Sequence, residues 1–386
     1  MREELQARLP ADFDRLHFVE ESRLHRFIWK IGLNMQLRLR YLTTEFILRL
    51  LTQHAQRRIA RRLIKEYRID VVHQPTPVSP REPSLLVDLG APLVVGPMNC
   101  AVDYPRAFRH LEWRSTRALV WLGRASSTFL NLVFAGKRRA SLLLVANERT
   151  RKALAGCLKV PCSQMSENGI DLSVWHPRAA PARSSDECRF VFVGRLIPSK
   201  GADLLLRALN QVVSSGCAIS VLIIGNGPEL ETLRAQARAD GLLAERPNDP
   251  GKVFFAGWQQ QSAVASYFAT QDCLVFPTLH ECGGAVALEA MAMELPVIAS
   301  GWGGPADYVD ERCGILIAAG SQERYVEDLA AAMVRLARDP ALRKRMGQEG
   351  RHKVEQLYTW DNKIDRILDY YRSAISSAAQ ERGKTG

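Results

Sequence analysis

After about Cys188 the chain takes on a regular alternation that leaves few folds open. Short apolar runs rich in β-branched residues alternate with longer segments of helical period, such as ADLLLRALNQVVSS and ELETLRAQARADG. This alternation is typical of a parallel sheet that helices cover on both faces. The six runs predict a complete doubly wound domain, and they lie at 190–195, 218–225, 253–257, 273–278, 296–300 and 314–317.

The first half shows the same pattern in a weaker form. Four apolar runs predict strands, at 15–20, 70–74, 93–97 and 142–147. The Pro-rich polar segment 176–187 is typical of a linker, and 386 residues suit about two domains. We therefore predict an α/β chain with domains at 1–178 and 179–360. Residues 361–386 should form a helix that packs back towards the amino-terminal domain and ends in a frayed tail.

The segment from His280 to Pro305, HECGGAVALEAMAMELPVIASGWGGP, links a predicted strand to a predicted helix through a Gly-Gly turn. Glu281 lies in the turn and Glu289 about two turns into the helix. Free backbone N–H groups and the helix dipole make such a helix start a binding site for anions, of which phosphate is the natural one.

The two glutamates have alternative interpretations. A glycosidase pair needs carboxyl groups about 5–9.5 Å apart, whereas eight helical residues rise about 12 Å, so the geometry disfavours that pair. The carboxylates could instead bind hydroxyls at opposite ends of an extended ligand. Equally, Glu281 could be a solvated loop residue and Glu289 a capped or paired helix residue.

Two cations follow the first strand of the second half, in VGRLIPSKGADLLLRAL. Arg195 and Lys200 could neutralise a diphosphate at the carboxyl end of a parallel strand, where such sheets bind ligands. Taken alone, an arginine and a lysine in a loop are more often solvated. The turn from Gly225 to Gly227 lacks the third glycine of a dinucleotide fingerprint, so we interpret it as a tight strand-to-helix turn.

Composition excludes several other classes. No apolar run approaches the roughly 18 residues of a spanning helix, and the charged start is unlike a signal peptide, which favours a cytoplasmic location. The eight cysteines, Cys157 among them, and the eight histidines show no metal-binding spacing.

The net charge of the chain is +11, and it is unevenly distributed. The segment 22–68 holds 12 Lys/Arg residues but only two Glu residues. Basic patches suit nucleic acid, anionic membranes or anionic substrates, but no nucleic-acid motif is present.

Taken together and in this order, the motifs resemble the retaining glycosyltransferases of family 4, which have the GT-B fold of two facing Rossmann-like domains. The resemblance covers roughly 160–370. It rests on SENGIDLSVWHP, FVGRLIPSKG, LIIGNGPE, HECGGAVALEAMA and ASGWGGPADYVD.

The resemblance implies a role for each matching residue. Arg195 and Lys200 would bind the donor diphosphate, and Glu281 would bind hydroxyls of the transferred sugar. Glu289 would bind the ribose. The rest of the implied donor site comprises Gly194, Gly225, Asn226, Gly227, Cys282, Gly283, Gly284 and Ala285. The resemblance also implies transfer with retention and without a metal or other cofactor.

The amino-terminal half departs from the family. It lacks the first strand and glycine-rich loop, so we expect an incomplete domain whose true start lies upstream, or a degenerate copy. Asn99 and Cys100 replace glycines of a loop near the reaction centre. His73, Asn99 and Asp103 are candidate acceptor-side residues, although a lone histidine at a strand end is more often structural.

The sequence therefore predicts an enzyme that moves a hexose from a UDP- or GDP-linked sugar to a glycan or lipid-linked acceptor, in polysaccharide or glycoconjugate biosynthesis. The alternative is a nucleotide-sugar-binding pseudoenzyme or inactive fragment. The basic helical region 23–51 could dock on the inner, anionic face of a membrane, or it could be a domain helix with a solvated basic face.

Overall fold

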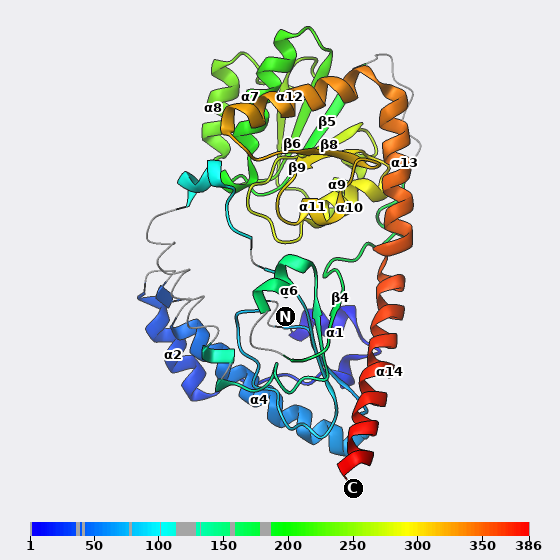
Figure 1. Cartoon of the computed structure of the whole chain (residues 1–386). Coiled ribbons are helices and arrows are strands. Elements are labelled where there is room, and N and C mark those ends of the chain that lie inside the picture. The colour runs from blue at the N-terminus through cyan, green and yellow to red at the C-terminus, as the bar shows by residue number, and fades with distance from the viewer. Residues whose placement is uncertain are drawn as a thin grey trace.

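The computed structural model describes residues 2–35, 39–40, 43–76, 79–100, 102–112, 129–131, 133–154, 159–177 and 187–385, with side chains to residue 380. The chain forms two α/β domains, the second above the first in Figure 1. Cys157 and most of the predicted linker 176–187 lie outside the described residues.

The amino-terminal domain is built on a four-stranded parallel sheet in the order β1-β2-β3-β4. Its elements are α1 (Arg2–Arg8), η1 (Phe13–Arg15), α2 (Arg23–Leu33), α4 (Thr44–Tyr67), β1 (Val72–Gln74), β2 (Leu93–Met98), η2 (Arg106–Leu111), β3 (Leu142–Val145), α6 (Glu148–Leu154) and β4 (Cys162–Gln164).

Alternate residues of these strands face two separate cores, as the two-residue period of a strand requires. On one face Val95 and Leu143 pack with Ile64 of α4. On the other, Val94 and Leu144 pack with Ala374 of α14 (Trp360–Thr385), which descends from the second domain along the side of the molecule (Figure 1).

In the amino-terminal domain, the strand predicted at 15–20 is wrong, and one strand of the structure was not predicted. Residues 16–22 have no regular secondary structure, although 15–20 has the composition of a strand. The fourth strand is instead β4, whose sequence CSQ has no strong strand propensity. Strand formation depends on a neighbour with which to pair, and β3 supplies one to β4. The incompleteness predicted for this domain stays a prediction.

The carboxy-terminal domain has the six predicted strands in one parallel sheet, in the order β10-β9-β8-β5-β6-β7. The chain moves outward from β5 to β7 and then returns to the other side of β5 with β8. The strand order therefore reverses between β5 and β8, and doubly wound sheets bind ligands at the carboxyl end of such a point. The elements are β5 (Cys188–Val193), η3 (Pro198–Lys200), α7 (Ala202–Ser214), β6 (Ile219–Ile224), α8 (Leu230–Ala239), β7 (Val253–Gly257), α9 (Gln261–Phe268), β8 (Cys273–Phe276), α10 (Ala285–Ala292), β9 (Val297–Ser300), α11 (Pro305–Tyr308), β10 (Gly314–Ile317), α12 (Gln322–Arg338) and α13 (Pro340–Leu357).

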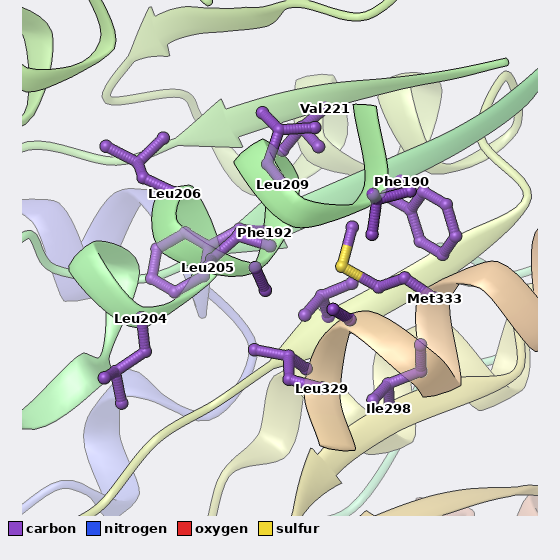
Figure 2. Packing of buried hydrophobic residues seen from close by; sticks show 14 of the residues in the cluster. Phe190, Phe192, Leu204, Leu205, Leu206, Leu209, Val221, Ile298, Leu329 and Met333 are labelled. Carbon is purple, nitrogen blue, oxygen red and sulfur yellow. The ribbon is translucent and has the colours of Figure 1, made fainter. Parts of the chain in front are cut away.

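Two cores sandwich this sheet. Figure 2 shows one of them, where Leu205 and Leu209 of α7 and Met333 of α12 pack on Phe190 and Phe192 of β5. The opposite core holds α9, α10 and α13 against the other face. Since β5 lies at the centre of the sheet and both faces are covered, the loop that leaves it has a rigid base.

Candidate active site

The structure brings Lys200 and Glu281 together at the point where the strand order reverses. Lys200 ends η3 after β5, Glu281 follows β8, and their side chains form a half-buried ion pair. The Ser199 carbonyl accepts hydrogen bonds from Thr278 Oγ1, at 3.2 Å, and from the Leu279 N–H, at 2.8 Å. These bonds tie the two loops together, so the ion pair has a fixed position.

Glu281 lies beside the start of α10. Gly284 at the N-cap has φ of +84°, and no side chain caps the helix. The second glycine pair supports this turn: the Gly304 N–H donates to the Glu281 carbonyl at 2.8 Å, and a β-carbon at Gly304 would overlap the Gly283 carbonyl. The helix start is therefore exposed to a ligand through backbone N–H groups, with Cys282 and Ala285 in the same turn.

Glu289 lies further along α10 and has different neighbours from Glu281. It is largely buried and hydrogen-bonded to Gln261 of α9, and burial raises its pKa to about 7. The two predicted carboxylates thus belong to different ends of the site.

Replacing Glu289 by glutamine should remove a pH dependence of stability. The folded state keeps the Glu289 proton between about pH 4.5 and 7, whereas the unfolded state has lost it, so the free energy of unfolding falls as pH rises through this range. The wild-type protein should lose at most about 3 kcal/mol more than Glu289→Gln between pH 5 and 8. Urea unfolding at several pH values measures this, with exposed Glu323→Gln as control. A difference between wild type and variant that does not change with pH would contradict it.

Arg195 and the predicted glycine turn lie on adjacent strand ends. Arg195 follows β5 and is exposed, and the Leu196 N–H donates to the Asn226 carbonyl at 3.0 Å. Gly225 has φ of +149°, and a β-carbon there would overlap the Gly194 carbonyl. At 2.8 Å its N–H donates to the Gly257 carbonyl, which precedes Trp258, an indole 68% exposed at the same edge.

Asn99 connects the two domains directly. It follows β2, and its Nδ2 donates to the Cys282 carbonyl at 2.9 Å and to Glu167 Oε1. Glu167 follows β4, and burial raises its pKa. Its other oxygen is buried without a hydrogen-bond partner among the described residues. A β-carbon on Gly283 would overlap the Glu167 carboxylate, so this acid touches the glycine turn.

A second set of contacts joins the domains around α11. Asp307 accepts from Asn147 Nδ2 at 2.9 Å and pairs with Arg149 at 3.0 Å. Trp302 Nε1 donates to the Asp103 carbonyl at 2.7 Å, while the Asp103 side chain is exposed. Thus Asp103 lies at the domain junction, where its backbone carbonyl contacts the second domain.

His73 has different partners from these residues. Its ring bonds Tyr371 of α14 at 2.7 Å through Nδ1 and the Gly96 carbonyl at 2.5 Å through Nε2. Burial lowers its pKa, which favours the neutral ring. Both ring nitrogens therefore serve the packing of α14 on the sheet.

The Cys282 thiol is not a reactive thiolate, and the part of the chain that the structure describes contains no cluster of metal ligands. Burial raises the pKa of Cys282 to about 11, so its thiol is protonated at neutral pH. Groups of three or more His, Cys, Asp or Glu that could hold a metal are absent from the described residues.

Five residues that form contacts at the domain junction were not predicted from the sequence as site residues: Asn147, Arg149, Glu167, Trp302 and Asp307. Asn147 carries a usable signal, since it ends a predicted strand and carboxyl ends of parallel strands meet at one edge. Glu167, Trp302 and Asp307 lie within two of the motifs that carry the family resemblance, SENGIDLSVWHP and ASGWGGPADYVD, but their contacts with the other domain depend on how the two domains pack.

Comparisons with known proteins assign the second domain to a family. Residues 175–353 match the family model described as glycosyl transferases group 1. These residues form a group 1 glycosyl transferase domain. The predicted resemblance is therefore confirmed, with Lys200, Glu281 and Glu289 all inside the matched range.

The curated relatives of the group 1 domain include D-inositol 3-phosphate glycosyltransferases. That of Mycobacterium tuberculosis is 33% identical over 227 residues, which cover 56% of this chain and 45% of the relative. The chain thus spans a little under half the length of the curated relatives it matches. The same figures hold for the Mycobacterium bovis protein.

Solved structures extend the likeness to both domains. A glycosyltransferase from Rickettsia africae has a TM-score of 0.63 at 13% identity, covering 97% of this chain and 87% of that one. Sucrose-phosphate synthase from Thermosynechococcus elongatus has a TM-score of 0.59 at 20% identity, covering 84% and 79%. Anabaena Alr3699/HepE, solved with UDP, has a TM-score of 0.57 at 16% identity, covering 83% and 82%. The predicted GT-B fold is confirmed.

Proposed function

We propose that this protein is a retaining glycosyltransferase that moves a hexose from a UDP- or GDP-linked sugar to a glycan or lipid-linked acceptor, in polysaccharide or glycoconjugate biosynthesis. The observation that carries the proposal is the Lys200–Glu281 ion pair at the reversal of strand order, beside the uncapped start of α10. It places a cation from the loop after β5 beside the turn that holds an acceptor of hydroxyl hydrogens and free N–H groups.

Each group suits a different part of the donor. Transfer breaks the bond between the anomeric carbon and the diphosphate, and negative charge grows on the leaving group. Lys200, Arg195 and the N–H groups of Gly284 and Ala285 would stabilise that charge, a role that requires no metal. Glu281 would hold sugar hydroxyls, and Glu289 would hold the ribose.

The relatives support this assignment. The curated matches include glycosyltransferases named for D-inositol 3-phosphate, and the Anabaena protein was solved with UDP and with UDP and glucose. Glycan or lipid-linked acceptors remain our proposal for this chain, as does its place in polysaccharide assembly.

A turnover assay tests the function. The protein would be incubated with UDP- and GDP-linked hexoses and a panel of oligosaccharide acceptors, and proton NMR would follow the anomeric signals. A product whose anomeric configuration equals that of the donor supports the proposal, and inversion would contradict it. Binding of a nucleotide sugar with no turnover on any acceptor would favour the nucleotide-sugar-binding pseudoenzyme.

We also propose that the amino-terminal domain docks peripherally on an anionic membrane, at its cytoplasmic face. No helix among the described residues has the length and apolarity to cross a membrane. One side of α2 instead exposes Leu24, Phe27 and Ile31, at 50%, 62% and 46%. Arg26 and Lys30 lie beside them on the same helix, which is the arrangement of an interfacial helix.

Replacing Phe27 by aspartate should weaken binding to vesicles that contain anionic lipid by about tenfold or more, because a large apolar side chain is lost and a negative charge gained. Co-sedimentation with neutral and anionic vesicles measures this. Tyr67→Asp is the control, since Tyr67 is equally exposed at the far end of α4. Equal binding by the Phe27 variant and wild type would exclude this face of α2.

A further inference from the structure

Two adjoining hollows lie between α2 and α4, away from the residues assigned to the donor. Their volumes are 370 and 480 Å³, within the range of about 300–1,000 Å³ that small-molecule sites occupy. Both are lined by Trp29 of α2 and by Leu48 and Thr52 of α4. One continuous concavity therefore centres on an indole ring, and we call it the Trp29 hollow.

The charges that line the Trp29 hollow nearly cancel. Its carboxylates are Glu20, Glu21, Glu45 and Glu82, and its cations are Arg26, Lys30 and Arg49, with His25 beside them. Much of this charge is paired within the protein, because Arg49 lies 3.3 Å from Glu82 and Arg40 lies 2.8 Å from Glu45. A lining without excess positive charge does not select a phosphate or another anion.

The remaining lining suits a ligand rich in hydroxyl groups. Thr52, Gln56 and Thr76 add hydroxyl and carboxamide groups that both donate and accept hydrogen bonds. Trp29 is 46% exposed, and the Arg40 guanidinium covers one face of its ring at 4.5 Å from the centroid. An aromatic surface surrounded by paired charges and small polar groups matches a sugar ring, which has an apolar C–H face and a polar rim.

The hollow also reaches the edge of the amino-terminal sheet at which the strands have their carboxyl ends. Thr76 follows β1 just as Asn99 follows β2, and these parallel neighbours end at the same edge of the sheet. Gln74 pairs with Val95, and Thr76 lies two residues beyond Gln74, so one end of the hollow lies at the edge of the sheet at which Asn99 meets Cys282. A chain of sugars could extend from the reaction centre past Thr76 to Trp29.

We infer that the Trp29 hollow binds an uncharged hexose unit of the acceptor glycan, at a distance from the hydroxyl that reacts. This inference rests on the proposed function for the identity of its ligand as an acceptor. The binding site itself depends only on the lining described above.

Trp29 and Phe27 provide a matched pair of variants. They are two residues apart on α2, so a helix of 3.6 residues per turn places them on opposite sides. Phe27 is 62% exposed and does not line either hollow. Trp29→Ala should therefore impair sugar binding and Phe27→Ala should not, whereas loss of Phe27 should impair membrane binding.

Saturation-transfer NMR would test this with the full chain and methyl glycosides of glucose, galactose, mannose and N-acetylglucosamine, together with disaccharides of each. We expect millimolar binding of at least one of these sugars, weakened about tenfold or more by Trp29→Ala and unchanged by Phe27→Ala. Trp29→Phe should retain part of the binding. Thr52→Phe should abolish it, because it places an aromatic ring at a position that both hollows share, and this keeps the test informative if Trp29→Ala does not fold.

Three results would overturn the inference: no sugar of the panel binds, binding survives both Trp29→Ala and Thr52→Phe in folded protein, or inorganic pyrophosphate displaces the sugar. UDP and GDP binding is measured on the same samples. Nucleotide binding without sugar binding would contradict this inference and leave the proposed function standing. Sugar binding that depends on Trp29, in a protein that binds no nucleotide, would contradict the proposed function and leave the hollow as a sugar site.

Discussion

Replacing Lys200 by alanine is expected to lower the rate of sugar transfer by a factor of about 10² to 10³, the usual loss when one preorganised donor to a developing negative charge is removed. Lys200 is the only partner in the described residues with which Glu281 forms an ion pair, so the variant loses a cation and leaves its carboxylate without that partner. The fall should appear in kcat and in kcat/KM alike, because the missing interaction is strongest in the transition state.

The fold of the Lys200 variant should remain intact, since the loop is held by the Ser199 carbonyl rather than by the lysine side chain. Lys344→Ala, at an exposed position of α13, is the matched control and should keep full activity. Steady-state kinetics with the donor that the turnover assay identifies measure both. Transfer by Lys200→Ala at the wild-type rate would refute the role assigned to this cation.

The largest loss of stability is expected from Gly225→Ala. Gly225 has φ of +149°, a region nearly closed to other residues, and a new β-carbon would overlap the backbone carbonyl of Gly194. Backbone strain and collision together should cost about 4 kcal/mol or more, which lowers the melting temperature by about 10 °C or prevents folding.

Gly216→Ala separates the two causes. Gly216 also has a positive φ, of +73°, but a β-carbon there meets nothing within 4 Å. Its cost should therefore be about 1–2 kcal/mol, from strain alone. Thermal unfolding followed by circular dichroism compares the variants. Equal melting temperatures for both would contradict a role for the contact between the β5 and β6 turns.

The sequence predicts the carboxy-terminal domain well because a short stretch of residues is enough to identify each of its strands. Each strand there is an apolar run, and glycine turns follow several of them, so both the element and its carboxyl end can be identified from a few residues. Lys200, Glu281 and the Gly225 turn meet because adjacent parallel strands end together. Their proximity follows from the doubly wound pattern, although their roles stay predictions.

The amino-terminal domain is less predictable because its strands and contacts depend on residues that are far apart in the sequence. Residues 15–20 have strand composition but no partner strand, whereas β4 has weak composition and a partner in β3. His73 ends a strand as a site residue would, yet Tyr371 bonds it from 298 positions away. Glu167 reaches the glycine turn only because the two domains pack together.

The donor site on the group 1 domain is tested most directly by a thermal-unfolding scan with UDP, GDP and ADP, alone and as sugar conjugates. A nucleotide at 100 times its dissociation constant should add about 2.7 kcal/mol and raise the melting temperature by several degrees. We predict a shift that is selective for UDP or GDP and is lost in Glu289→Ala. No shift with any nucleotide would contradict a donor site on the group 1 domain, and the same shift in wild type and Glu289→Ala would contradict the role assigned to Glu289.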